Sequence, residues 1–476
     1  MSFSPLYSSS AFGVTTPDSL TLLINLDNSI FGPTSPEVAA AVSHLCGFYE
    51  AGEERKPIPA DDYYQVAQDY YERLLRADSS GVQSLSLLCY VSAYYHELRH
   101  VHDLMSTAYG QTVLFTNLNY YQNVPALVAE LTKCQERYPT RRIKLPLGSH
   151  LSDLKDIDED IRKLILQFPQ LHQTIRNLDP AGNGFHGRLT VRHLLECNAT
   201  NAQSFLVSDV FGDEAHTRLI EFISEGAAAQ AYWQINSDML EAFYAKGFRG
   251  RGLGKLISYL AWCALFGGIQ SDEQKGDGVS IVNFYHALVE HVLHHIDVID
   301  FESVRSLVDG FCDTWGLQRP AGNVEATRAN LESRAQRMEK AWQDSGASEI
   351  GAPLVAAYKK IVGAFVDINQ VIAEMPEQYF GNYFWLVSSG ILPSAHLFVR
   401  RKGQLLHGLS SGTELLPVET WDYIAQMSSV LTVLLDRPNQ DSDFWFLQKE
   451  ALANLETYAP NGVSLKLEYS MSPVIR

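Results

Sequence analysis

The segment that most constrains the fold of this chain is the pentapeptide HELRH at residues 96–100, which lies inside an apolar helical pattern. We expect a single helix here that ends just before Gly110, a residue typical of helix stops. At 3.6 residues per turn, His96 and His100 project from one face, and Glu97 lies about 100° round the helix from His96. The apolar residues that recur at helical intervals are Leu85, Leu88, Val91, Tyr95, Leu98 and Met105.

Two imidazoles on one helical face are suitable ligands for a zinc ion that keeps a further position open for water. A carboxylate beside that position can accept a proton from the water as it attacks a polarised carbonyl. This HExxH pattern resembles that of zinc metallopeptidases. The resemblance implies peptide-bond hydrolysis of a peptide or protein substrate, with Zn²⁺ as cofactor, His96 and His100 as ligands and Glu97 as the catalytic base.

A catalytic zinc ion usually has three protein ligands, so one more is expected elsewhere in the chain. In metzincins the motif continues to a glycine and a histidine, but Asp103 and Ser106 stand at those positions. The pattern therefore resembles the gluzincin type, in which a glutamate from a later helix completes the site. We favour Glu196, because the small residues Ala199 and Ala202 would let its apolar helix pack closely against the HExxH helix.

Two alternatives for the third ligand remain open. Glu225 is also a lone carboxylate in an apolar segment rich in small residues. Asp103 shares a helical face with His96, but the rise of about 10.5 Å between them favours a contact with an imidazole rather than with the ion. His193, one turn before Glu196, is a candidate catalytic residue that would stabilise the oxyanion of a tetrahedral intermediate.

Charge and cysteine content restrict the partners and the compartment. The 476 residues carry a formal net charge of −18, which argues against nucleic acid and anionic membranes as partners. The six cysteines include no CxxC pair, and the N-terminus lacks the build of a secretory signal, so we expect a cytoplasmic protein. The longest apolar run, residues 256–269, is too short to cross a bilayer. A protease in that compartment would need control, which suggests a regulatory partner and a regulatory or defence role.

The periodicity predicts a mainly α protein (α+β) with a few short strands. We divide it into an N-terminal region (1–80), a zincin-like metallopeptidase core (81–250) and a mainly helical C-terminal region (251–476). Residues 117–123, rich in Tyr and Asn, are expected to form a connection, and Thr190 is expected to cap a helix. Strand patterns occur at residues 20–26, 396–399 and 463–469.

Other motifs support competing interpretations. RGRGLG at 249–254 resembles the acetyl-CoA loop of GNAT-like acetyltransferases, although residues 221–243 before it have a helical pattern rather than strands. His291 and His295 have metal-ligand spacing but no glutamate after His291, which favours a histidine-rich surface. A di-iron bundle would need a second ExxH, which the sequence lacks. A non-catalytic zinc-binding scaffold or interaction protein is the alternative to an enzyme.

Overall fold

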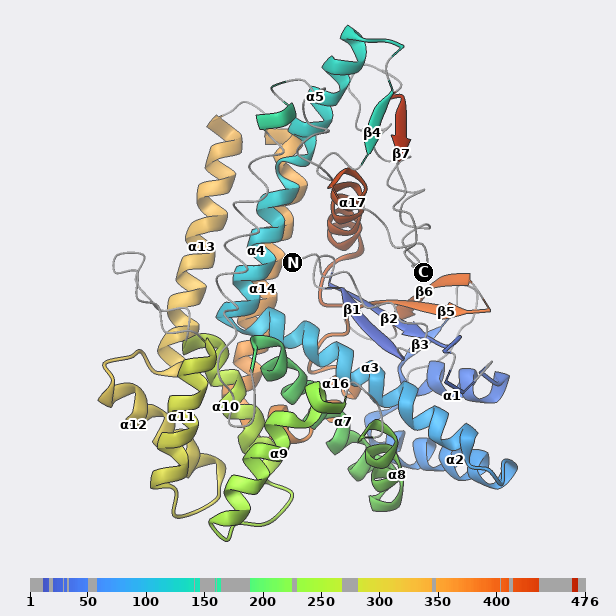
Figure 1. The fold of residues 1–476 in the computed structure, drawn as a ribbon, viewed down its shortest axis with the longest axis vertical. Coiled ribbons are helices and arrows are strands. Elements are labelled where there is room, and N and C mark those ends of the chain that lie inside the picture. Colours follow the sequence, from blue (N-terminus) through green and yellow to red (C-terminus); the bar gives the residue numbers. More distant parts are fainter. Residues whose placement is uncertain are drawn as a thin grey trace.

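The computed structural model describes residues 12–16, 20–28, 30–31, 34–49, 58–140, 142–145, 159, 161–163, 189–224, 229–267, 281–344, 348–402, 404–410, 414–435 and 465–469. These residues are mainly helical and carry a five-stranded sheet and a separate two-stranded sheet, which confirms the predicted mainly α class (Figure 1). The helices are α1 (Pro36–Leu45), α2 (Tyr63–Ala77), α3 (Val82–Ser106), α4 (Ala108–Tyr121), α5 (Val124–Arg137), α7 (Val191–Phe211), α8 (Asp213–Ser224), α9 (Ala229–Ala245), α10 (Leu253–Gly267), α11 (Ile281–His295), α12 (Phe301–Thr314), α13 (Pro320–Asp344), α14 (Ser348–Glu374), α15 (Pro376–Gly381), α16 (Tyr383–Ser388) and α17 (Val418–Leu435).

The main sheet combines three strands from the first 49 residues with two strands from residues 396–410. Its strands lie in the order β1 (Gly13–Thr16), β2 (Thr21–Asn25), β5 (His396–Arg401), β6 (Gln404–Ser410) and β3 (Phe48–Tyr49). β2 runs parallel to β5, with Thr21 opposite His396. β2 is buried along its whole length, as expected for a central strand covered on both faces. The predicted strands near residues 20 and 396 are therefore confirmed, and they are neighbours. A separate two-stranded sheet consists of β4 (Ile143–Leu145) and β7 (Leu467–Tyr469).

Helix α3, which carries the HELRH segment, occupies the centre of the fold. It packs against β1 and β2 of the sheet and against α1, α2, α7 and α14 (Figure 1). Nearly all of its side chains are buried, the polar ones Ser92, Arg99, His102 and Asp103 included. A buried polar group is costly unless it is hydrogen-bonded, so each of these side chains needs a partner from a neighbouring element.

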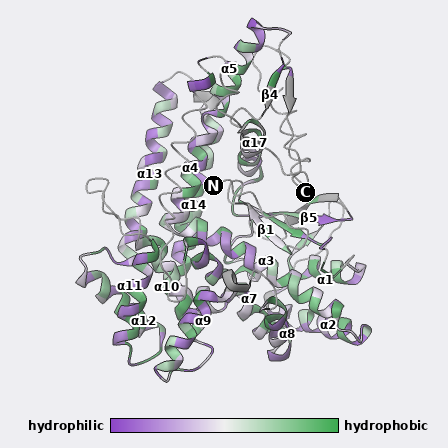
Figure 2. Ribbon diagram, in the orientation of Figure 1, coloured by the Kyte–Doolittle hydropathy of each residue, from purple (hydrophilic) through white to green (hydrophobic). Residues whose placement is uncertain are grey.

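One hydrophobic core runs through the three regions proposed from the sequence, whose boundaries stay a prediction. It contains Leu22 from β2, Leu98 from α3, Leu260 from α10 and Phe365 from α14, all fully buried. By contrast, α13 is hydrophilic along most of its length and buries only a few side chains (Figure 2). No helix in the described ranges has both the length and the apolar character that crossing a bilayer requires.

The corner between α3 and α4 differs from the prediction. α3 ends at Ser106, and Thr107 begins α4, its hydroxyl accepting a hydrogen bond from the Gly110 amide at 3.1 Å. Gly110 thus lies inside the first turn of α4 and is not a stop. Its role is steric, because a Cβ atom there would come within 2.1 Å of the Leu104 carbonyl oxygen. Only glycine lets the two helices approach so closely.

The predicted connection at residues 117–123 is also wrong over most of its length, because α4 continues to Tyr121. Leu118, Tyr120 and Tyr121 are buried in the core. Packing of these side chains outweighs the low helix propensity of a Tyr- and Asn-rich segment.

Substitution of Gly110 by alanine is expected to lower the free energy of unfolding by about 1–3 kcal/mol, because the added methyl group overpacks the corner against the backbone of α3. Gly363, exposed in α14 with nothing within 4 Å of the place that an added Cβ atom would take, is the matched control. Gly363→Ala should raise stability by about 0.5–1 kcal/mol, since alanine favours helix. Chemical denaturation of both variants measures the difference, and equal stability would contradict the steric role of Gly110.

Candidate metal centre

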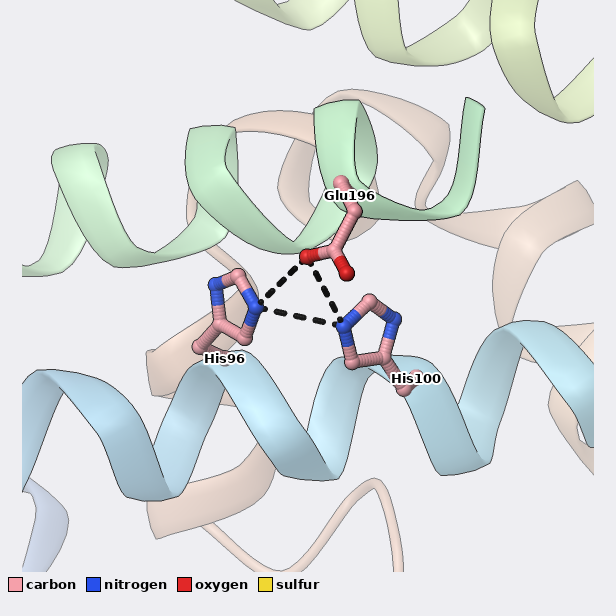
Figure 3. Close-up of side chains that lie close together, drawn as sticks. All are labelled: His96, His100 and Glu196. Carbon is pink, nitrogen blue, oxygen red and sulfur yellow. Dashed lines mark hydrogen bonds and ion pairs between the residues drawn. The ribbon is translucent and has the colours of Figure 1, made fainter. Parts of the chain in front are cut away.

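Three side chains from two helices converge at the middle of α3. His96 and His100 lie on one face of α3, and Glu196 reaches them from α7 (Figure 3). The Oε2 atom of Glu196 lies 3.2 Å from His96 Nε2 and 3.4 Å from His100 Nε2. The two Nε2 atoms are 3.1 Å apart. The structure thus brings together the three residues that the sequence analysis selected as ligands, although metal binding itself stays a prediction.

Protons alone do not satisfy this triangle of atoms. Each of its three contacts is short enough for a hydrogen bond, but an ionised carboxylate has no proton and each Nε2 carries at most one. If both imidazoles were protonated at Nε2, two donors would face each other across 3.1 Å. A cation bound by all three atoms would use a lone pair of each. The donor set therefore fits a metal ion better than a hydrogen-bond network.

The spacing and chemistry of the donors fit zinc. Two ligand atoms bonded to one zinc ion at about 2.0–2.1 Å with tetrahedral angles lie about 3.3–3.4 Å apart. The observed separations of 3.1, 3.2 and 3.4 Å are close to this value. Two imidazoles and one carboxylate suit zinc, whereas calcium and magnesium prefer sets of oxygen ligands.

The electrostatic environment keeps Glu196 ionised. Burial alone would raise the pKa of this carboxyl group, but the neighbouring His100 and His96 side chains hold it well below its usual range. Burial would lower the pKa of His100, yet the Glu196 carboxylate raises it, with a further contribution from Glu97. On its other side, Glu196 Oε1 accepts a hydrogen bond from Arg192 Nε at 3.2 Å. Arg192 therefore fixes the carboxylate with Oε2 turned toward the imidazoles.

Glu97 points toward the sheet beside the two histidines. The Thr15 hydroxyl of β1 lies 2.8 Å from Glu97 Oε2 and 2.8 Å from the Glu97 carbonyl oxygen, and its one proton can serve either acceptor. β1 passes so close that a Cβ atom on Gly13 would come within 2.8 Å of Glu97 Cγ. The Glu97 side chain is thus held between the edge strand and the histidine face of α3.

His193 has a structural role at the start of α7. Its Nδ1 accepts a hydrogen bond from the Thr190 backbone amide at 3.1 Å and lies 2.9 Å from the Thr190 hydroxyl. This pair closes a capping box, which confirms that Thr190 caps the helix. Because Nδ1 accepts, the ring proton of the neutral imidazole is on Nε2. The catalytic role of His193 stays a prediction.

The remaining polar residues of α3 support the centre rather than join it. Asp103 Oδ1 accepts from Arg99 Nε at 3.0 Å, so this carboxylate pairs with a guanidinium and not with an imidazole. Arg99 also donates to the Tyr379 carbonyl oxygen at 2.8 Å, and its guanidinium lies 4.1 Å from the centre of the Tyr379 ring. The contacts between Arg99 and Tyr379 join α3 to α15.

His102 is a buried structural histidine on the far side of α3. Its Nε2 donates to the Pro393 carbonyl oxygen at 2.8 Å, and its Nδ1 lies 2.6 Å from the Tyr383 hydroxyl. Burial lowers the pKa of His102 to about 3, so the imidazole is neutral and Tyr383 donates to Nδ1. These bonds add a second link from α3 to the C-terminal part of the chain.

The two competing motifs that the structure describes lie outside the group of His96, His100 and Glu196. Glu225 lies outside the described residues. Residues 249–252 lie in the connection between α9 and α10, residues 253 and 254 begin α10, and Arg251 pairs with Asp213 and Asp209. His291 and His295 lie next to each other on α11, with ring centres 4.6 Å apart and ring planes tilted by 52°. Among the described residues, no acidic or cysteine side chain joins them in a cluster of three ligands.

Two residues of the centre were missed in the sequence. Arg192 precedes Glu196 by four positions, so their pairing is the ordinary ion pair of one helical face and could have been found. Thr15 could not, because it approaches Glu97 only through the packing of β1 on α3.

Comparison of the chain with known proteins finds no relative. No family model matches the chain, and neither the curated proteins nor the solved structures include a significant match. Within the described residues, His96, His100 and Glu196 form the group of ligand atoms that could hold an ion, all within 4.8 Å of one another.

The buried Arg99–Asp103 pair gives a stability prediction. Arg99→Met or Asp103→Leu alone should each cost about 3–5 kcal/mol of unfolding free energy, because either change leaves a fully buried partner without its counter-charge. The double variant should be more stable than either single variant, since no uncompensated charge remains. Urea denaturation of the three proteins tests this, and a double variant that loses the sum of both single costs would show that the two side chains act independently.

Proposed function

We propose that this protein is a zinc-dependent peptidase in which His96, His100 and Glu196 hold the ion and Glu97 is the general base. The observation that carries the proposal is the triangle of donor atoms, with separations of 3.1–3.4 Å, that α3 and α7 form beside a carboxylate. A triangle of this kind is needed for a catalytic zinc site, which leaves one position for water.

Each residue has a role that follows from its surroundings. His96 and His100 coordinate through Nε2 as neutral imidazoles, and Glu196 supplies a negative charge that offsets part of the charge of the ion. Zinc, when bound, polarises a carbonyl group and lowers the pKa of a water molecule. Glu97 accepts the proton of the attacking water and passes it to the leaving amine. The Thr15 hydroxyl orients the Glu97 carboxylate for this transfer.

The position of β1 favours an extended peptide as substrate. β1 lies at the edge of the sheet, and in the described part of the chain it pairs only with β2. An edge strand offers unpaired backbone groups to which an extended segment can add as a further strand. Because Thr15 of β1 contacts Glu97, a peptide on that edge would pass next to the proposed base.

Purified protein is expected to contain about one zinc ion per chain, and His96→Ala, His100→Ala and Glu196→Gln should each lose most of it, because each removes one of three ligands. Glu225→Gln, the competing glutamate, is the matched control and should keep the ion. Elemental analysis and chelator titration measure both.

Metal-free wild-type protein that takes up no added zinc would overturn the proposal. Loss of zinc from Glu225→Gln but not from Glu196→Gln would contradict the assigned third ligand.

Glu97→Gln is expected to retain zinc and fold but to lose peptide cleavage by at least about 100-fold, because an amide cannot accept the proton of water. Cleavage of a mixed peptide library, followed by mass spectrometry, measures the activity of wild type and variant. Glu221→Gln, on the exposed surface of α8, is the matched control and should cleave as wild type does. A zinc-loaded wild type that cleaves no peptide would favour a non-catalytic zinc scaffold instead.

A further inference from the structure

A groove of about 650 Å³ lies between α4, α13 and α14, and none of its lining residues belongs to the candidate metal centre. The three helices pack against one another and run side by side in Figure 1. Its volume is in the range of small-molecule binding sites, about 300–1,000 Å³. The residues that determine its chemistry are Thr116 and Asn119 of α4, Arg334, Arg337 and Trp342 of α13, and Tyr358 of α14.

The groove is positively charged in a chain of net charge −18. Arg334 and Arg337 are three residues apart on α13, so they lie on one helical face, and the described residues that line the groove include no acidic side chain. Within the described residues neither guanidinium is paired with a carboxylate, and Arg337 donates only to the Ser333 hydroxyl, at 2.8 Å. The nearby Glu339 is instead held by Lys359 at 2.9 Å. Two guanidinium groups that make no ion pair with a described carboxylate favour an anionic ligand.

The opposite wall of the groove is fixed and provides a neutral donor. The buried Tyr358 hydroxyl donates to Asn119 Oδ1 at 2.6 Å, which sets the orientation of that amide and leaves its Nδ2 group as a donor.

α13 also provides an aromatic side chain to the groove. The Trp342 indole lies so close to α14 that a Cβ atom on Gly351 would come within 2.2 Å of the ring. An aromatic surface held in place in this way can stack on a planar group at little entropic cost.

We infer that this groove binds a small phosphate ester that carries a planar ring. A phosphate group has enough oxygens to accept hydrogen bonds from two guanidinium groups at once, whereas one arginine already satisfies a carboxylate in a bidentate pair. The Asn119 amide adds a neutral donor, and Trp342 provides the surface for the ring. This inference is independent of the proposed peptidase function, because the two sites share no residue.

Isothermal titration of the full chain with AMP tests the assignment, with inorganic phosphate and adenosine as partial probes. AMP is expected to bind one site per chain and more tightly than either partial probe, because only AMP contacts both the arginines and the indole. The double variant Arg334→Ala, Arg337→Ala should weaken AMP binding by about tenfold or more, since it removes the charge-assisted hydrogen bonds.

Two further variants are controls. One tests whether the net charge of α13 alone accounts for AMP binding, and the other tests whether AMP binds at the metal centre. Arg328→Ala, on α13 but paired with Glu325, should bind AMP as wild type does. His96→Ala should also bind AMP normally, whatever its zinc content.

Absence of saturable AMP binding to the full chain overturns the inference. So does AMP binding that the double arginine variant leaves unchanged, or that Arg328→Ala weakens equally. Inorganic phosphate that binds as tightly as AMP would overturn the assignment of a ring-bearing ligand.

Discussion

Burial of a polar helix is the constraint on which this structure depends. α3 packs against the sheet and several helices, and it carries His96, Arg99, His102 and Asp103 in the core, with His100 half-buried. Each buried polar group destabilises the fold by about 1–3 kcal/mol if it is left without a partner. The elements around α3 provide those partners, and the packing of the C-terminal part of the chain follows from this need.

The partners of α3 differ in kind on its different faces. Toward α15 and α16, Arg99 and His102 form hydrogen bonds in which each contact has its own proton, although Arg99 Nη2 and Asp103 Oδ2 have no hydrogen-bond partner among the described residues. Toward α7, His96, His100 and Glu196 face one another with more lone pairs than protons. The two faces therefore differ in whether the contacts between their polar side chains have enough protons, and on the α7 face they do not.

The sequence predicted the parts of this site that depend on local spacing. His96 and His100 were predicted from the helical period of α3, and Glu196 from the apolar and small residues of α7. Each of these patterns lies within a single helix and can be recognised without knowledge of the rest of the fold. The contact of Thr15 with Glu97 and the contacts of Arg99 with Tyr379 depend on how distant elements pack, which no local pattern encodes. The errors at Gly110 and in α4 have the same origin, since tertiary packing there outweighed local signals for a stop and a loop.

The distribution of the donors along the chain implies a preorganised centre. His96 and Glu196 are 100 residues apart in sequence, but α3 and α7 belong to the same core, so folding alone brings their side chains together. Arg192 holds one oxygen of Glu196, and Thr15 holds one oxygen of Glu97. A centre whose donors are already fixed would lose little side-chain entropy on binding an ion. Because the same contacts stabilise the core, any ion that binds only the folded chain would stabilise α3 and α7 together.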